Sequence, residues 1–160
     1  MFGYRRGQGA TEYLVLLAVV LIVALVAMAL LNFFPDLSTY AKISQSDSYW
    51  RGVSRPFAIT ESAQSSSSAN LIMVVENKDA EQRILTTIQV SGTGVATNYT
   101  VTGNNRYFSA GEKRTFTIPL STNCTAGSVY EYKISFNYTN ADGTISKVQI
   151  GDKPLMGKCS

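Results

Sequence analysis

The side chain whose position most needs a chemical explanation is Glu12, a single acid at the start of a long apolar stretch. From Tyr13 to Leu31, 19 residues follow it without a charged or strongly polar side chain. A carboxylate in the middle of a membrane-spanning segment costs roughly 2.5–3.5 kcal/mol on insertion scales, and less near the interface. We therefore expect Glu12 to have a cationic partner.

Two other kinds of residue could be covalently modified. The two cysteines, Cys124 and Cys159, are expected to pair if this part of the chain lies outside the cell, and two separate buried thiols are the alternative. A bridge of this loop length would stabilise the fold by roughly 3–4 kcal/mol in the chain-entropy description. Three N-x-[ST] sequons are candidate N-glycosylation sites, at Asn98, Asn123 and Asn137.

The residue patterns that most enzymes use are missing. Histidine is absent, so the commonest side chain for acid–base catalysis and for metal binding is not available. The sequence has no Gly-rich phosphate loop, nucleophile elbow or metal-ligand cluster. We expect this protein not to be an enzyme and to need no cofactor or metal.

The charge of the chain limits its partners. Fourteen basic and eleven acidic side chains give a formal charge of +3, which is mild. Nucleic-acid binding would need a basic face formed by clustered residues. We therefore expect no nucleic-acid partner.

The apolar stretch is long enough to cross a membrane. At roughly 1.5 Å per residue, a helix from Tyr13 to Leu31 would span close to 30 Å, which is one hydrocarbon thickness. The basic residues Arg5 and Arg6 precede it and predict that the N-terminus lies in the cytoplasm. The rest of the chain is too polar for a second span and would then lie outside.

The order of parts at the N-terminus differs from that of an ordinary secretory signal. A Sec-type signal has its small-residue cleavage site after the apolar region, whereas here Gly7 comes before it. This arrangement resembles archaeal type IV pilins with a class III signal peptide, in which a short basic leader ends in Gly and the apolar helix stays on the mature protein. The matching residues are Arg5, Arg6, Gly7, Gln8, Glu12 and Tyr13.

The resemblance implies processing and assembly. A prepilin peptidase would cut between Gly7 and Gln8, so that residues 1–7 are a leader and Glu12 becomes the fifth mature residue, where type IV pilins carry an acid that assists subunit registration. The implied partners are this peptidase, the pilus assembly machinery, the membrane before assembly, and identical subunits in a homopolymer. The implied location is an extracellular filament at the cell surface with a role in adhesion, made from a precursor in the cytoplasmic membrane.

A second helical segment is predicted after the apolar stretch. Pro35 would kink or break the helix within 31–35, because a proline inside a helix removes a hydrogen bond and clashes with the preceding turn. Helical spacing resumes at Asp36 and places three apolar residues on one face, namely Leu37, Tyr40 and Ala41. The helix should end near residues 50–52, which gives an N-terminal helical region over 8–52.

From Pro56 on, the hydrophobic period changes to two. The clearest strand covers 130–139, and further alternating strands are expected at 84–90 and 116–120. The run 71–75 is apolar throughout, as in a strand buried on both faces, and Asp142-Gly143 predicts a tight hairpin after 130–139. The predicted fold is α+β, with a long apolar N-terminal helix and an antiparallel β-sandwich head, Ig-like or a partial barrel, over 53–160.

The sequence leaves more than one function open. A structural pilin subunit would lose residues 1–7 and polymerise through its helix. A bitopic membrane-anchored protein would instead keep Met1 to Gly7, stay in the membrane, and use its extracellular β-sandwich as a ligand-binding module. A minor pilin that primes or tips a filament is a further alternative, since the sequence does not separate major from minor subunits.

Overall fold

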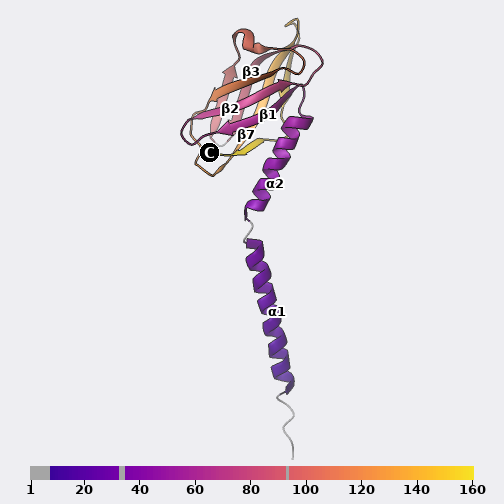
Figure 1. Ribbon diagram of the computed structural model, residues 1–160, viewed down its shortest axis with the longest axis vertical. Coiled ribbons are helices and arrows are strands. Elements are labelled where there is room, and N and C mark those ends of the chain that lie inside the picture. Colours follow the sequence, from indigo (N-terminus) through magenta and orange to yellow (C-terminus); the bar gives the residue numbers. More distant parts are fainter. Residues whose placement is uncertain (1–7, 33–34, 93) are drawn as a thin grey trace, which may run out of the picture. The chain divides into compact units, whose positions relative to one another are not determined.

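The chain folds in the expected α+β order, with helices first and antiparallel strands after them (Figure 1). The computed structural model describes residues 8–32, 35–92 and 94–160. The chain divides into two compact units, one up to Tyr40 and one from Ala41 onward. The elements of the described residues are α1 (Gln8–Asn32), α2 (Pro35–Ser48), the π-helical turn η1 (Tyr49–Val53), β1 (Phe57–Gln64), β2 (Asn70–Asn77), β3 (Arg83–Gly92), β4 (Val95–Thr100), the 3-10 turn η2 (Gly103–Arg106), β5 (Tyr107–Phe108), β6 (Lys113–Pro119), β7 (Val129–Asn140), β8 (Ser146–Ile150) and β9 (Leu155–Lys158).

Helix α1 has apolar side chains on every side from Tyr13 on, and Glu12 is its one charged residue. Its segment Thr11–Leu30 has a mean hydropathy of 3.1, is long enough to cross a bilayer, and has no buried side chain. A helix that is hydrophobic all round belongs in lipid or in the interior of a larger structure. The segment is therefore compatible with a membrane anchor or with a signal sequence.

The predicted interruption within 31–35 includes residues 33 and 34, which lie outside the described residues. Helix α1 ends at Asn32, and α2 begins at Pro35, one residue before the expected restart. Proline is tolerated at the first position of a helix because its missing N–H would have no partner there, and its φ already fits. Pro35 therefore opens the second helix.

The face of α2 that contacts the C-terminal strands is not the face that carries Leu37 and Tyr40. Those two side chains are 67% and 54% exposed. Ser46 is buried instead, and its hydroxyl donates to the carbonyl of Pro154 (2.8 Å) and accepts from the N–H of Met156 (3.0 Å). The second half of α2 is thus attached to the C-terminal segment of the head.

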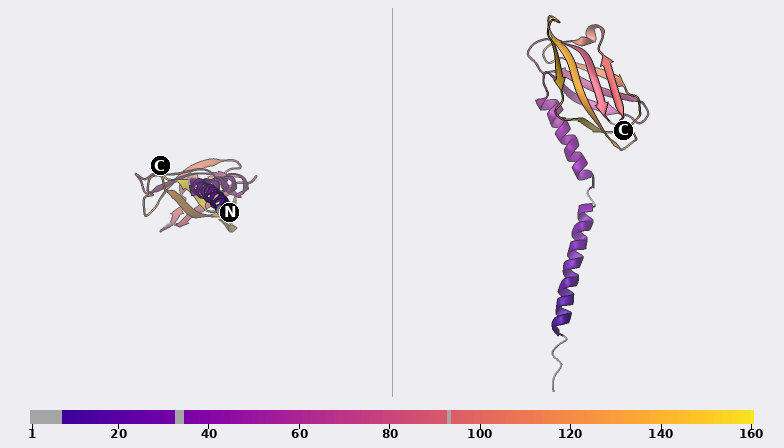
Figure 2. Two further views of the ribbon diagram at one scale, coloured as in Figure 1. Left: turned by 90° about the horizontal axis from the view of Figure 1, so that it is seen from below. Right: turned by 180° about the vertical axis from the view of Figure 1, so that it is seen from behind.

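The head consists of two antiparallel sheets. The smaller has the strand order β1–β2–β6, and the larger has the order β4–β3–β7–β8, with β5 beside β3 and β9 beside β7. The smaller sheet lies in front in Figure 1, and the right-hand view of Figure 2 shows the larger sheet, with β7 in orange. The hydrophobic core takes side chains from both sheets, so the predicted β-sandwich is confirmed.

Strand β7 keeps the predicted alternation over its whole length. Its buried positions are Tyr130, Tyr132, Ile134, Phe136 and Tyr138. Aromatic rings connect the sheets across the core, since the Phe57 ring of β1 lies 5.5 Å from the Phe136 ring of β7, centroid to centroid. These aromatic residues are therefore core residues, and edge-to-face or tilted contacts between them add to the burial.

The apolar run 71–75 is not buried on both faces, contrary to the prediction. Leu71, Met73 and Val75 are fully buried, whereas Ile72 is 44% exposed and Val74 is half-buried. Strand β2 is the middle strand of a sheet that has the core on one side only, so alternate side chains point away from it. A short apolar run does not distinguish these two kinds of strand.

The expected alternation in 84–90 is interrupted by a β-bulge. The register between β3 and β7 shifts between Leu85 and Thr87, and as a result Ile84 and Leu85 are both buried. The hydroxyl of Thr86, the extra residue, donates to a backbone carbonyl of β7 (2.8 Å). Bulges bend a strand and increase its twist, which changes which side chains face the core.

The predicted Asp142-Gly143 turn joins β7 to β8. Gly143 has a φ of 72°, and its N–H donates to the carbonyl of Asn140 (3.0 Å). The side-chain oxygen of Asn140 also accepts from the N–H groups of Thr144 and Ile145, both at 3.0 Å. The amide side chain thus imitates a backbone turn and fixes the register of β8 along β7.

Trp50 is fully buried where the turn η1 meets the sandwich. Its ring packs edge-on against that of Phe136, with centroids 6.2 Å apart. A Cβ built on Gly151 would come within 2.4 Å of the indole ring and 3.2 Å of the carbonyl of Ile134. Glycine is therefore required where the chain passes between Trp50 and β7.

Replacing Gly151 with alanine is expected to destabilise the head by about 1–3 kcal/mol, because the added methyl group overpacks the site beside Trp50. Gly52→Ala is the matched control, since a Cβ at Gly52 meets nothing within 4 Å. Denaturant unfolding, followed by the fluorescence of the single tryptophan, measures both variants. Equal stabilities for the two would contradict the packing described here.

Candidate functional site

Glu12 lies on the exposed surface of α1, four residues after the first residue of the helix. The side chains around it on that surface are Thr11, Val15 and Leu16. Four residues of α-helix rise about 6 Å, so Gln8 and Glu12 are about one turn apart. Helix α1 has no acid in its first turn, so the carboxylate lies just beyond the part of the helix where the dipole most favours a negative charge.

The predicted cleavage point lies at the boundary of the described residues. Gly7 is outside them, and Gln8 is the first residue of α1. A cut between these two residues would leave the whole of α1 on the mature chain. Its new amine would lie at the start of the helix that carries Glu12.

The three sequons lie in two separate parts of the head. Asn98 is an exposed residue of β4, and Asn137 is a half-buried residue of β7. Both alternate with residues that face the core, so they lie on the outer face of the six-stranded sheet. Asn123 is exposed in the loop between β6 and β7. The fold therefore brings Asn98 and Asn137 onto one surface and keeps Asn123 apart from them.

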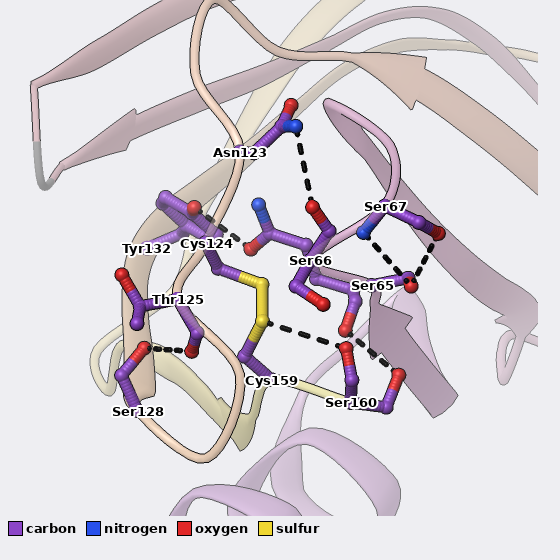
Figure 3. The surroundings of a disulfide bond; sticks show 11 residues. Ser65, Ser66, Ser67, Asn123, Cys124, Thr125, Ser128, Tyr132, Cys159 and Ser160 are labelled. Carbon is purple, nitrogen blue, oxygen red and sulfur yellow. Dashed lines mark hydrogen bonds between the residues drawn. A yellow bond between two sulfur atoms is a disulfide. The ribbon is translucent and has the colours of Figure 1, made fainter.

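The predicted disulfide between Cys124 and Cys159 is confirmed (Figure 3). The two Cα atoms are 6.0 Å apart, which is a usual separation for a bridge. The bond joins the loop before β7 to the residue after β9. The alternative of two separate thiols is excluded.

The disulfide belongs to a larger C-terminal clasp, which we define as Cys124, Cys159 and Ser160. The N–H of Cys159 donates to the carbonyl of Ser128 (2.8 Å), next to the start of β7. The N–H of Ser160 donates to the carbonyl of Gln64 at the end of β1 (3.1 Å). Because β1 and β7 belong to different sheets, the clasp holds one end of the sandwich together.

Two tyrosine hydroxyls of β7 reinforce the same end of the sandwich. Tyr130 and the hydroxyl of Ser62 in β1 are 3.2 Å apart, and Tyr132 donates to the side-chain oxygen of Gln64 (2.9 Å). Burial raises the pKa of Tyr130 above its ordinary value, and the hydrogen bond with Ser62 partly opposes this. Tyr130 is therefore a neutral cross-link between the sheets at physiological pH.

Sequence reasoning missed Gln149, a buried amide at the junction between helix and head. Its Oε1 accepts from the N–H of Phe57 (2.9 Å), and its Nε2 donates to the hydroxyl of Ser54 (2.7 Å) and to the carbonyl of Phe57 (2.8 Å). The amide thus satisfies backbone groups at the start of β1 that would otherwise be buried without partners. A lone glutamine in a strand gives no signal of this role.

Asn77 is a second buried amide that the sequence did not reveal. Its Nδ2 lies within 2.8, 3.1 and 3.2 Å of the carbonyls of Glu81, Phe108 and Ser109, and its Oδ1 accepts from the N–H of Asp79 (3.0 Å). These bonds connect the turn after β2 to the segment after β5. The short asparagine side chain at the end of an apolar strand was the available clue, since such residues favour turns.

No protein-family model matches the chain, and a comparison with curated proteins finds no match. The family resemblance therefore depends on the N-terminal sequence alone, over residues 1–34. The function must be argued from helix α1, its single acid, and the disulfide-bonded head.

Replacing both Cys124 and Cys159 with serine is expected to destabilise the head by roughly 3–4 kcal/mol, because the bridge across 35 residues no longer restricts the unfolded chain. Denaturant unfolding of the full chain in detergent measures the change. The unmodified protein treated with a reductant should match the double variant. A stability that neither reduction nor the double substitution alters would contradict a supporting role for the clasp.

Proposed function

We propose that this chain is the precursor of a type IV pilin of the archaeal kind, a structural subunit that polymerises through its N-terminal helix into a surface filament. In this proposal, prepilin peptidase removes residues 1–7, the helix forms the core of the filament, and the β-sandwich forms its outer surface. Adhesion is the proposed role of that surface.

The observation that carries the proposal is where helix α1 begins and what it contains. The helix starts at Gln8, immediately after the glycine of a basic leader. Its one charged side chain is Glu12, about one turn from its start, and 19 residues without a charged or strongly polar side chain follow. In a subunit that is processed and then polymerises, a leader that ends before the apolar helix leaves that helix and its acid on the mature chain. A Sec signal is cut after its apolar region, so this order of parts would have no use there.

The exposed apolar surface of α1 supports assembly on physical grounds. A helix with this hydropathy must be covered by lipid or by other apolar helices. Moving it from lipid into a bundle of identical helices exchanges one apolar environment for another, and its backbone hydrogen bonds are satisfied internally in both. Several alanines would allow close approach between helices, namely Ala18, Ala24, Ala27 and Ala29.

Glu12 would act as the registration residue. Cleavage after Gly7 creates a positively charged amine on Gln8, which is the cationic partner that a carboxylate in an apolar environment needs. In a filament, the amine of an incoming subunit would pair with the Glu12 carboxylate of a subunit already in place. This pairing would set the axial position of helices whose apolar surfaces have no register of their own.

The properties of the head support a location outside the cell. Its disulfide and clasp are typical of proteins in oxidising compartments. The basic residues Arg5 and Arg6 on the other side of the apolar segment predict a cytoplasmic N-terminus. The two ends of the chain would then lie on opposite sides of the membrane before assembly.

The deciding experiment is N-terminal sequencing and intact-mass analysis of the protein sheared from cells. We expect polymeric extracellular material whose chains begin at Gln8. Chains that begin at Met1 and occur only in membranes would overturn the proposal and favour a membrane-anchored β domain that binds a ligand.

Replacing Gly7 with valine is expected to leave an uncut precursor in the membrane and to abolish filaments, because a bulky side chain blocks the peptidase at the residue before the cut. Gly9→Ala is the control, since a Cβ on Gly9 meets nothing within 4 Å and alanine favours the helix. Immunoblotting of membrane and sheared fractions measures both outcomes. Normal piliation by the Gly7 variant would contradict processing at this site.

Replacing Glu12 with glutamine is expected to leave processing intact but to reduce the yield of filaments about tenfold or more, because each added subunit loses a charge pair in apolar surroundings. The reason is that the incoming amine loses its counter-ion while the size of the side chain is kept. Glu61→Gln removes the same charge from an exposed position of β1 and serves as the control. Filament yields that respond equally to both substitutions would argue against a specific role for Glu12.

A further inference from the structure

The outer face of the six-stranded sheet contains a depression of about 340 Å³. Strands β3, β4, β7 and β8 all contribute to it, so it lies across the strands rather than along one of them. Its volume is at the lower end of the range of about 300–1,000 Å³ that is typical of sites for small ligands. The polar or charged outward-facing residues that line it are Gln89, Ser91, Asn98, Lys133 and Ser135, and the apolar ones are Ala96 and Ile150.

The strand register places two of the three sequons in neighbouring rows on this face. One row runs across the four strands through Asn98, Gln89, Ser135 and Ile150. The next row runs through Thr100, Thr87, Asn137 and Val148. Strands are separated by roughly 4.8 Å, so the first row spans about 14 Å, and Asn137 lies two residues along β7 from Ser135, or about 7 Å.

The lining of the depression offers the groups that bind sugar hydroxyls. Amides and hydroxyls provide both donors and acceptors, and the Ser135 hydroxyl donates to the Oε1 of Gln89 (2.8 Å), which orients that amide. Ile150, 72% exposed, offers an apolar surface for the face of a sugar ring. The ammonium of Lys133 adds a site for an anionic substituent, such as a carboxylate or a sulfate.

Strand β8 contributes exposed apolar side chains to this face. Strand β8 is at one edge of the larger sheet, and its outward residues Val148 and Ile150 are 58% and 72% exposed. These two β-branched side chains form an apolar strip on this face, and covering them would remove apolar surface from water. A sugar chain lying across the sheet would cover them.

We propose that an N-linked glycan at Asn98, Asn137 or both lies across this face instead of projecting into solvent. Its first rings occupy the depression beside Lys133, and its next rings cover Ile150 and Val148. The face is thus a modification site and the binding site for the attached glycan. This inference rests on the external location of the head that is proposed above, but it does not depend on filament assembly.

The test uses the subunit extracted in detergent from the cells that produce it, so that no neighbouring head is present. Three variants each remove one sequon while the asparagine is kept: Thr100→Ala, Thr139→Ala and Thr125→Ala. Glycopeptide mass spectrometry measures occupancy, and an amine-reactive reagent measures the accessibility of Lys133. Lys113, on the other sheet, is the internal reference, and the Asn123 sequon in its separate loop is the matched control.

We expect glycan on Asn98 or Asn137 and a severalfold rise in Lys133 labelling when that sequon is removed, with no rise for Thr125→Ala. If the same variants unfold at an unchanged temperature, the rise in labelling reflects exposure of Lys133 by loss of the glycan and not unfolding of the head. Glycan at Asn98 or Asn137 without any change in Lys133 labelling would mean that the sugar projects outward, which overturns the inference.

Other outcomes separate this inference from the proposed function. Glycan on Asn123 alone would overturn the inference and leave the external location of the head standing. If Lys133 is protected from labelling in sheared filaments but not in the extracted subunit, a neighbouring copy of the chain covers this face, and the inference is overturned. A bare chain at all three sequons would also overturn the inference, while a start at Gln8 in filaments would still support the pilin function.

Discussion

The head depends on strand β7, a strand of twelve residues that has neighbouring strands on both edges. One edge pairs with β3, and the other pairs with β8 near the hairpin and with β9 near the clasp. Its alternating aromatic residues fill the core, and one of them, Phe136, contacts both Trp50 and Phe57. A single long strand therefore connects the helix junction, the core and the C-terminus, because each of these parts packs or pairs against it.

The C-terminal segment explains how the second half of α2 is attached to the sandwich. After β8, the chain passes beside Trp50 at Gly151, accepts and donates hydrogen bonds with Ser46 of α2, and ends in the clasp. The buried amide of Gln149 completes the junction by bonding backbone groups of β1. Contacts between residues more than a hundred positions apart thus hold the second half of α2 against the head.

The two parts of the chain differ in how their apolar side chains are kept from water. Helix α1 presents apolar side chains in every direction and must be covered by lipid or by similar helices. The head buries its apolar side chains in its own core, which is rich in aromatic residues, and a disulfide supports it. In the proposed filament, the helix supplies the association energy and Glu12 supplies the register, while the outer faces of the sandwich are left for contacts with the environment.

The sequence by itself determined the features that depend on local pattern: the apolar helix, the alternation of 130–139, the Asp142-Gly143 turn and the α+β order of the fold. The proposed roles of Gly7, Gln8 and Glu12 also rest on spacing along the chain. Tertiary structure alone decided that β2 is buried on one face, that Thr86 forms a bulge, and that Gln149 and Asn77 are buried hydrogen-bonding residues. It also placed Asn98 and Asn137 in neighbouring rows of one sheet. These properties depend on which strands become neighbours, and strand pairing joins residues far apart in the chain, which local periodicity does not encode.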